Sequence, residues 1–482
     1  MPGQSTKQQR RVAILTLGCA RNEVDSEELA GRLADEGWTL VADTEDADAV
    51  LVNTCGFIDA AKKESIDTVL AARASADEQG KPQAVVAVGC LAERYGNVLA
   101  GELPEADAVL GFDDYPAIAA RLTSVLDGDI PQAHEPVDRR TLLPISPIER
   151  QEQRELAREG WTPPVPRIRL GSGPVASVKL ATGCDRRCTF CAIPAFRGSF
   201  VSRTPPEVTA EIGEMVGHGV QEVILVSENT TSYGKDLGDM RLLETVLPQF
   251  ASGTGVSRIR LSYLQPAEMR PGLIAAITGT PAVADYFDLS FQHASPTVLR
   301  AMRRFGGTED FLELIEAIRE LAPAAGLRSN VIVGFPGERD EDVDELATFL
   351  EAARLDAVGV FAYSDEDGTA AASLPDKSDE AMIESRRARI ADLVEELMAQ
   401  RAAERIGEKV EVLIEGIDDD GKAFGRAAHQ GPDDGACLIE DLIDGTIDGT
   451  IDRVSPLPQV GAWVDGTVID SHGVDLIVRP ER

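Results

Sequence analysis

The sequence predicts an α/β protein of about three domains. Three observations support this: strand-like apolar runs alternate with helical patterns near the amino terminus, six more strand–helix units follow, and short strands with Gly and Asp turns close the chain. The predicted architecture is an amino-terminal parallel α/β domain, a central partial (β/α)6 TIM-like barrel and a small carboxy-terminal all-β, OB-like barrel. A chain of 482 residues can bury these separate cores.

The amino-terminal domain, residues 1–130, is predicted from four short apolar runs bounded by turn residues: 11–19, 49–55, 84–90 and 108–112. Helical patterns follow the runs: 23–36, 58–74 and 115–126. Near-continuous apolar strands that alternate with helices are typical of a parallel sheet covered on both faces. Residues 131–174 hold eight of the 27 prolines and are predicted to be a Pro-rich linker, with a charged helical piece at 149–159.

The central domain, residues 175–406, is predicted from six strand candidates separated by helical patterns: 178–182, 222–227, 258–263, 286–292, 330–335 and 358–363. Thr204 followed by two prolines and Glu207 has the pattern of a helix start. Helices are also expected at 311–321, 341–353 and 380–406. Six consecutive βα units predict an incomplete parallel barrel with its chemistry at the carboxyl ends of the strands. Residues 407–482 form the small β module, in which the duplication at 443–452 is expected to be a turn-rich loop.

The composition limits the partners of the chain. Lys and Arg number 47 against 82 Asp and Glu, a net charge of −35, which repels phosphate polyanions and weighs against nucleic acid as the main ligand. We find no run of eighteen apolar residues and no apolar signal region, so we expect a cytoplasmic protein without a membrane partner. In a reducing cytosol, grouped cysteines are more often metal ligands or catalysts than disulfides.

One group of cysteines, Cys184, Cys188 and Cys191, has a CxxxCxxC spacing directly after the first barrel strand. Three thiolates can fill three corners of a [4Fe–4S] cube and leave the fourth iron open to a substrate or cofactor. The alternatives are a zinc site or a redox-active thiol pair. Zinc usually takes a fourth Cys or His at a matching spacing, which this sequence lacks. We therefore favour the open cluster.

A second group, Cys19, Cys55 and Cys90, places one cysteine at the end of each of three predicted parallel strands. The carboxyl ends of parallel strands meet at one sheet edge, where such sheets bind ligands. Gly18, Gly56 and Gly89 adjoin the thiols and would let a bulky cluster approach the backbone. The alternative is three buried structural cysteines. Three thiols at equivalent strand ends favour a second three-thiolate cluster.

Other candidate residues are weaker. Gly334, Gly337 and Glu338 end a barrel strand in a glycine turn that could approach an adenosine cofactor, although a plain βα turn explains them equally well. His293 is expected near the barrel mouth, as a site residue or as a structural histidine. Cys437 is far from both cysteine groups and is expected to be a small core residue whose role the sequence does not assign.

These motifs resemble those of the methylthiotransferase family of radical S-adenosylmethionine (SAM) enzymes over nearly the whole chain. The matching segments include Gly18-Cys19 with Asn22, Asn53 to Ile58, Gly89-Cys90, Gly183-Cys184 to Pro194 with Arg197-Gly198, Gln292-His293 and Val333 to Glu338. The resemblance implies a radical SAM barrel, a terminal TRAM module and two [4Fe–4S] clusters. Cys184, Cys188 and Cys191 would hold the cluster that binds SAM, with Gly334, Gly337 and Glu338 as SAM contacts. Cys19, Cys55 and Cys90 would hold the other cluster.

The resemblance is stronger to the branch that modifies the β-carbon of an aspartate in small ribosomal subunit protein twelve. A sister branch modifies tRNA adenosine and shares both cysteine groups. The terminal module, residues 408–482, has seventeen acidic and six basic residues, a net charge of −11 that suits a basic protein better than RNA. We therefore expect a ribosomal-protein substrate, no direct nucleic acid substrate, and an electron donor such as flavodoxin or ferredoxin. A tRNA methylthiotransferase, or a non-catalytic iron–sulfur electron carrier, is the alternative.

Overall fold

The computed structural model describes residues 10–141, 167–440, 443–447, 450–453 and 458–481, and these form two compact units. Unit 1 holds the described residues up to Ser172, together with Gly183–Asp185 and Ala192–Ser199. Unit 2 holds Gly173–Thr182, Arg186–Cys191 and the described residues from Phe200 onward. Two pieces of the predicted barrel domain thus pack with the amino-terminal part of the chain.

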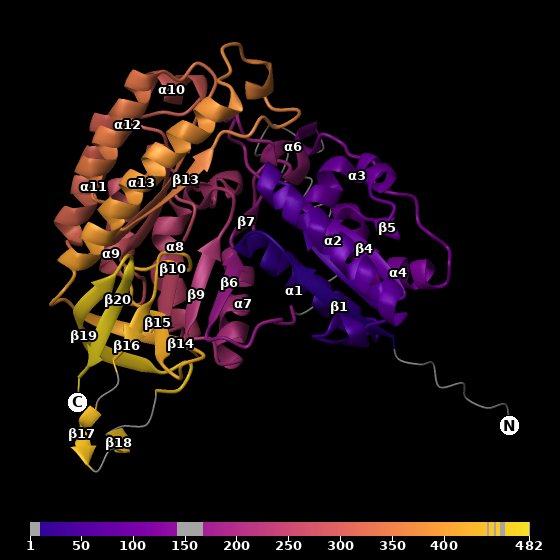
Figure 1. Ribbon diagram of the computed structural model, residues 1–482, viewed down its shortest axis with the longest axis horizontal. Helices are drawn as coiled ribbons and strands as arrows, with labels where there is room; N and C mark the ends of the chain where they lie inside the picture. The colour runs from indigo at the N-terminus through magenta and orange to yellow at the C-terminus, as the bar shows by residue number, and fades with distance from the viewer. Residues whose placement is uncertain (1–9, 142–166, 441–442, 448–449, 454–457, 482) are drawn as a thin grey trace. The chain divides into compact units, whose positions relative to one another are not determined.

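Unit 1 is built on a five-stranded parallel sheet (Figure 1). Its strands, in spatial order, are β2 (Thr39–Leu40), β1 (Arg11–Thr16), β3 (Ala49–Thr54), β4 (Ala84–Gly89) and β5 (Ala108–Val109). Helices α1 (Ala20–Asp35) and α4 (Ile118–Leu126) cover one face, and α2 (Asp59–Gln79) and α3 (Cys90–Glu102) cover the other. Strands β3 and β4 are buried along their whole length because helices pack on both faces. The predicted parallel α/β fold is confirmed.

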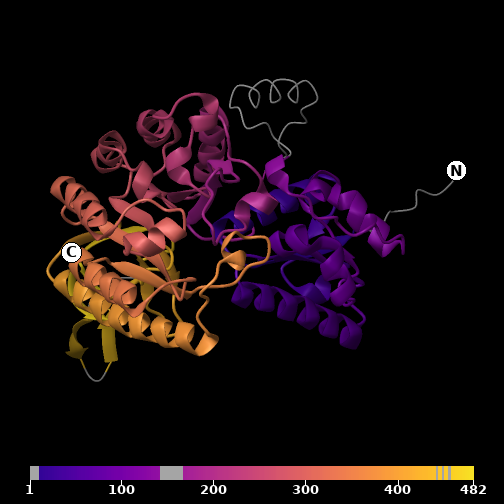
Figure 2. The ribbon, with the colours of Figure 1, turned by 90° about the horizontal axis from the view of Figure 1, so that it is seen from above.

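Unit 2 contains six parallel strands in chain order: β6 (Val175–Lys179), β9 (Glu222–Val226), β10 (Arg258–Leu261), β11 (Tyr286–Gln292), β12 (Gly326–Val333) and β13 (Ala357–Ala362). Two isolated parallel bridges, Ile259 with Val283 and Leu264 with Leu289, join the two halves of the sheet. The larger helices that follow the strands are α7 (Pro205–Gly217), α8 (Leu242–Thr254), α9 (Pro271–Gly279), α11 (Thr308–Leu321), α12 (Asp340–Ala353) and α13 (Glu380–Glu404). These helices flank the strands of unit 2 (Figure 2), which confirms the predicted partial barrel.

Several predicted elements differ from the structure. The strand expected at 108–112 is only the two residues of β5, and the helix expected at 115–126 begins at Ile118, because a 3-10 turn containing Pro116 precedes it. The strand expected at 178–182 is β6, which starts earlier, and the chain then forms a short antiparallel pair of β7 (Ala181–Thr182) with β8 (Val201–Ser202). The strand expected at 330–335 is β12, which begins four residues earlier, at Gly326. The charged and polar residues Arg328 and Ser329 interrupt the apolar pattern that would indicate this start. The loop expected at 443–452 is a hairpin of β17 (Ile443–Ile447) and β18 (Thr450–Arg453), because the duplicated halves pair with each other. The helix expected at 149–159 lies outside the described residues.

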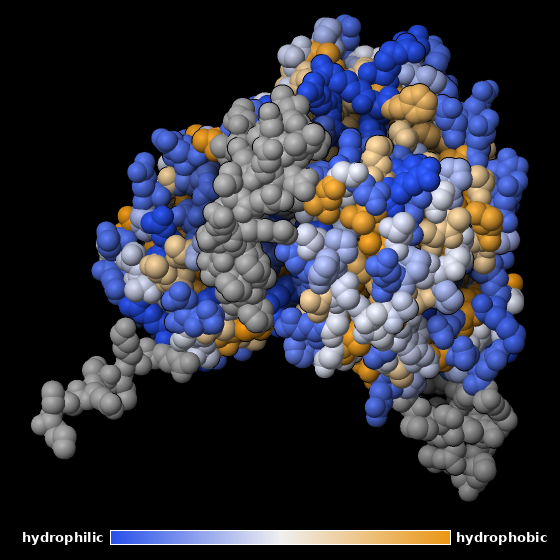
Figure 3. All heavy atoms as spheres, turned by 180° about the vertical axis from the view of Figure 1, so that it is seen from behind, coloured by the Kyte–Doolittle hydropathy of each residue, from blue (hydrophilic) through white to orange (hydrophobic). Residues whose placement is uncertain are grey.

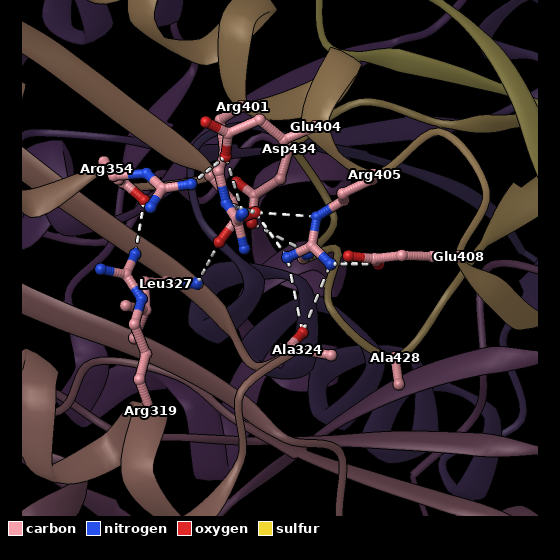
Figure 4. Close-up of polar contacts among 12 residues, drawn as sticks. Arg319, Ala324, Leu327, Arg354, Arg401, Glu404, Arg405, Glu408, Ala428 and Asp434 are labelled. Atoms are coloured by element: carbon pink, nitrogen blue, oxygen red, sulfur yellow. Dashed lines mark hydrogen bonds and ion pairs between the residues drawn. The ribbon is translucent and has the colours of Figure 1, made fainter.

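The carboxy-terminal module is a closed barrel of β14 (Lys409–Ile417), β15 (Ala423–Arg426), β16 (Cys437–Ile439), β20 (Asp475–Pro480) and β19 (Trp463–His472). Ion pairs at the end of α13 join this helix to Asp356, directly before β13, and to Glu408, directly before β14 (Figure 4). Arg401 and Arg405 both contact Asp356 Oδ1, at 3.1 and 2.6 Å, and Arg405 also pairs with Glu408 at 2.8 Å. Arg328 of β12 also pairs with Asp434, between β15 and β16, at 2.8 Å, and this pair fixes the β module to the barrel within unit 2.

The distribution of apolar residues on the surface and along the helices agrees with the absence of a long apolar run in the sequence. On the face shown in Figure 3, apolar residues are scattered among hydrophilic ones. Of the helices within the described ranges, none has the length and hydropathy needed to span a bilayer.

Candidate functional site

The first group of cysteines lies at the carboxyl edge of the sheet in unit 1. Cys19 directly precedes α1, Cys55 follows the last residue of β3, and Cys90 is the first residue of α3 after β4. Strands β1, β3 and β4 are direct neighbours in the sheet. The structure therefore places the three thiols on three adjacent strand ends, as the parallel arrangement predicts.

Glycines allow the three cysteine loops to approach each other closely. A Cβ on Gly18 would lie 2.9 Å from Cys55 Sγ, and Gly18 has a φ of +88° that disfavours other residues. A Cβ on Gly56 would lie 2.8 Å from Leu91 Cα, next to Cys90. These contacts agree with the prediction that small residues beside the thiols permit close packing.

Buried amide and hydroxyl groups fix the loops that carry these cysteines. Asn22 donates from Nδ2 to Leu17 O at 2.8 Å and to Thr54 O at 3.2 Å. Asn53 donates to Asn22 O at 2.9 Å and to Ser26 Oγ at 2.8 Å. Ser65 Oγ accepts from the Cys55 backbone N–H at 2.9 Å. The sequence indicated Asn22 and Asn53 only through the family resemblance, because the hydrogen bonds between their two segments join residues 27 to 32 positions apart in the chain.

The electrostatic environment of the thiols is uneven. Burial raises the pKa of Cys90 to about 11 and also raises the pKa of Cys55. Burial would also raise the pKa of Cys19, but Arg21 and Arg197 outweigh it, so that the pKa of Cys19 lies below its usual value. Metal ligation needs thiolates. Binding of a cluster must therefore displace protons from Cys55 and Cys90 at neutral pH.

The second group of cysteines lies in the loop after β7. The Cys184 backbone N–H donates to Gly198 O at 3.0 Å within unit 1. In unit 2, Thr189 bonds through its backbone to Met302 and Ala371, and Arg304 Nη1 lies 3.8 Å from Cys188 Sγ. Backbone bonds thus hold this loop on both sides of Cys188.

A half-buried carboxylate anchors the same loop to the barrel. Arg186, between Cys184 and Cys188 in the sequence, pairs with Glu268 at 3.0 Å. Glu268 also accepts hydrogen bonds from Ser232 at 2.7 Å and from Asn229 at 3.2 Å. Burial would raise the pKa of Glu268, but Arg186 and these donors lower it below its usual value. Sequence reasoning missed Arg186 and Glu268, which are 82 positions apart and share no local pattern.

No three His, Cys, Asp or Glu side chains within the described part of the chain are arranged to hold a single metal ion. A single zinc ion requires sulfur ligands at about 2.3 Å, whereas a [4Fe–4S] cube is larger than one ion and spreads its thiolates more widely. The donor sets fit the predicted clusters chemically, since each offers three cysteines. The assignment of the six cysteines as cluster ligands stays a prediction.

The residues predicted to contact SAM form a tight turn after β12. Gly334 and Gly337 both have a φ of +81°, and a Cβ on Gly334 would lie 2.7 Å from the Ile383 side chain. Glu338 is buried and accepts from the Gly334 backbone N–H at 2.9 Å and from Arg386 at 3.0 Å. These contacts show that Gly334 and Glu338 stabilise the turn. Their contact with SAM stays a prediction.

The remaining candidates are buried. His293 accepts from the Ser295 backbone N–H at Nδ1, and its Nε2 lies 3.3 Å from Glu338 Oε2, so it belongs to the same buried turn. Cys437 is fully buried in the core of the β module, with its Sγ 3.0 Å from Gln430 Oε1. The expectation that Cys437 is a small core residue is confirmed.

Comparison with known proteins defines the class. Residues 178–350 match the model of the radical SAM superfamily, and residues 11–111 match a family described as uncharacterized protein family UPF0004. Among solved structures, the radical SAM methyltransferase TsrM from Kitasatospora setae is similar, with a TM-score of 0.52 over 73% of each chain. Its sequence identity of 16% supports a shared fold only. The class is that of radical SAM enzymes.

Curated relatives define the family within this class. Proteins named ribosomal protein uS12 methylthiotransferase RimO share 59% identity in Kineococcus radiotolerans, over 98% of this chain and 97% of the relative. The RimO of Frankia alni is 62% identical over 98% of this chain and 93% of the relative, and that of Streptomyces avermitilis is 56% identical over 98% and 97%. The chain belongs to the RimO family of radical SAM methylthiotransferases. This membership confirms the predicted enzyme class, with SAM and [4Fe–4S] clusters as its cofactors.

Proposed function

We propose that this chain transfers a methylthio group to the β-carbon of an aspartate in ribosomal protein uS12. The observation that carries the proposal is the placement of Cys19, Cys55 and Cys90 on three adjacent strand ends in a chain that also carries the CxxxCxxC loop. One three-cysteine set suffices for radical initiation. A second set with an open iron is suited to deliver sulfur.

The target carbon explains the need for radical chemistry. Hydrogens on the β-carbon of an aspartate are very weakly acidic, and a general base near neutral pH removes such protons too slowly. When bound, one SAM molecule would supply the hydrogen abstraction, and a second SAM molecule would supply the methyl group. In this proposal Cys184, Cys188 and Cys191 hold the cluster that binds SAM, and the turn of Gly334, Gly337 and Glu338 orients it. Cys19, Cys55 and Cys90 hold the cluster that presents sulfur.

The charge of the chain supports a protein substrate. The β module carries a net charge of −11 and the whole chain −35. A basic ribosomal protein is attracted to such a surface, and the phosphates of tRNA are repelled. We therefore propose no direct nucleic acid substrate. We also propose that the chain has no membrane partner and a cytoplasmic location. An electron donor such as flavodoxin or ferredoxin would supply the reducing electron.

Mass spectrometry of uS12 tests the proposal. The anaerobically reconstituted enzyme, SAM, dithionite and uS12 should give a methylthio mass gain on one aspartate, and tRNA digests should stay unmodified. Cys184→Ala should abolish both SAM cleavage and the mass gain. Cys55→Ala should keep SAM cleavage and lose the mass gain.

Cys437→Ala is the matched control, because this cysteine lies in the core of the β module. It should retain both activities. Thiolation of uS12 by the Cys55→Ala variant would contradict the second cluster, and a modified adenosine in tRNA would contradict the substrate.

A further inference from the structure

Arg197 is a basic residue that contacts the first cysteine group from within unit 1. It ends the short helix α6 (Ile193–Arg197), which follows Cys191 in the sequence, yet Ala192–Ser199 packs within unit 1. Its Nη2 lies 3.1 Å from Cys90 Sγ, 2.8 Å from Asp25 Oδ2 and 3.3 Å from Asn22 Oδ1. A guanidinium from the radical SAM segment therefore touches a predicted ligand of the other cluster.

The surroundings hold this guanidinium in one place. Only 6% of the Arg197 side chain is exposed, and its head lies 5.1 Å from the centre of the Phe112 ring. Ala192 and Phe196 of the same segment pack in one apolar cluster with Cys90. A cation with a carboxylate partner, an aromatic face and little solvent is fixed and weakly screened. Asp25 offsets part of this charge, so the guanidinium acts on the Cys90 thiolate chiefly through their direct contact at 3.1 Å.

We infer that Arg197 is a positioning residue for the cluster of Cys19, Cys55 and Cys90: it orients Cys90 Sγ as a ligand and stabilises the reduced cluster. This inference rests on the proposed function, which assigns a [4Fe–4S] cluster to these thiols. Reduction adds one negative charge to the cluster. A hydrogen bond and a positive charge at a ligand sulfur therefore favour the reduced form and raise the reduction potential.

The test is a redox titration of the full-length chain in which Cys184, Cys188 and Cys191 are replaced by Ala, so that only the first cluster is present. Electron paramagnetic resonance during dithionite titration reports the reduced cluster. Arg197→Met should shift the equilibrium between oxidised and reduced cluster at least tenfold toward the oxidised form, or about 59 mV for one electron. Arg197→Lys keeps a positive charge but loses the planar guanidinium, so it should give a smaller shift.

Arg73→Met is the matched control, because Arg73 also pairs with an aspartate of unit 1, Asp107, and donates to the Glu105 carbonyl rather than to a thiol. It should leave the potential unchanged. Loss of iron from the Arg197→Met protein alone, at an unchanged melting temperature, would also support the inference, since Cys90 would then need Arg197 to act as a ligand. If Arg197→Met lowers the melting temperature, the iron content and reduction potential of Arg197→Lys are compared with those of the unsubstituted protein instead.

Two outcomes can be told apart. Full iron content with an unchanged potential in both Arg197 variants would overturn the role of Arg197 and leave the proposed function intact. Absence of a cluster in the unsubstituted background, with Arg197 present, would instead contradict the proposed function.

Discussion

At the residue scale, glycine is required where the cysteine loops meet. Gly18 combines a φ of +88° with a position at which a Cβ would lie 2.9 Å from Cys55 Sγ. Gly37 has nearly the same φ, +86°, but no atom lies within 4 Å of a Cβ placed there. A substitution at Gly37 therefore introduces backbone strain alone. A substitution at Gly18 introduces the same strain and also crowds Cys55, a predicted cluster ligand.

Substitution of these glycines tests the packing of the site. Both Gly18→Ala and Gly37→Ala should cost about 1–2 kcal/mol of stability through the left-handed backbone. Gly18→Ala should in addition displace Cys55 and lose most of the iron at the first cluster, while Gly37→Ala keeps it. Iron content per chain and thermal unfolding measure the two effects. Equal iron content in both variants would contradict the structural role of Gly18.

Individual residues of the site differ in how well sequence predicts them. The cysteines could be predicted because their spacing repeats with the βα units, and chain order fixes which strand ends are neighbours. Arg197 could not be assigned a partner, because its contact with Asp25 joins residues 172 positions apart. The contact of Glu338 with SAM stays a prediction, and its hydrogen bonds with Gly334 and Arg386 could not be predicted because only the folded turn brings these groups together.

At the scale of elements, buried charges join the barrel strands to the β module. Glu222 of β9 is fully buried and pairs with Arg260 of β10 at 2.8 Å and Arg258 of β10 at 3.3 Å. Arg260 also donates to the backbone of Ala428, beyond β15, at 2.8 Å. The cluster thus connects two strands of the barrel to the terminal module within unit 2.

The buried ion pairs of Glu222 should make the stability of unit 2 sensitive to acid. Burial alone would raise the pKa of Glu222, but Arg260 and Arg426 lower it from 4.5 to about 2. A carboxyl whose folded pKa is depressed stabilises the fold fully above its unfolded pKa and loses that effect as pH falls. The melting temperature should therefore fall between about pH 4.5 and pH 2.

Glu222→Gln is the comparison that isolates this group. It removes the buried charge, so it should lower stability at pH 7 by about 3–5 kcal/mol and make the pH dependence in this window shallower. Scanning calorimetry at several pH values measures both effects. An identical acid response in the two proteins would show that other carboxyl groups cause it.

The cysteine loop offers a second test at the level of elements. Glu268→Gln weakens the pair with Arg186, so the loop should hold its cluster less firmly and SAM cleavage should fall several-fold. Glu244→Gln is the control, because Glu244 forms an equivalent pair with Arg270 at 2.7 Å and its partner lies outside the cysteine loop. Iron content and deoxyadenosine yield measure the effect. Equal loss in both variants would indicate general destabilisation.

The elements were predicted to different degrees. Long helices with clear amphipathic patterns matched closely, as α12 (Asp340–Ala353) did against 341–353. Short elements such as β7 and β8 were missed, because two-residue strands carry no periodicity. The bounds of the three predicted domains and of the linker stay a prediction, although Ala192–Ser199 packs with unit 1 through contacts that no local pattern in the sequence reveals.

At the scale of the whole molecule, charge is the property that relates the chain to its proposed substrate. The net charge of −35 is spread over both units, and the β module alone contributes −11. Attraction between an acidic enzyme and a basic protein raises the rate of encounter and weakens with salt. If the β module guides uS12, then charges on this module should matter more than equal charges elsewhere.

Paired neutralisation of exposed acids tests this idea. Asp419 and Asp420 lie exposed in the turn between β14 and β15, and Asp35 and Glu36 lie exposed at the end of α1. Asp419→Asn with Asp420→Asn should raise KM for uS12 about two- to tenfold at low salt, because each exposed charge contributes up to about 1 kcal/mol. The matched pair Asp35→Asn and Glu36→Gln should leave KM nearly unchanged. SAM cleavage without uS12 should be the same in both, and the difference in KM should shrink at high ionic strength. Equal KM values for the two double variants would mean that uS12 is not guided by this part of the β module.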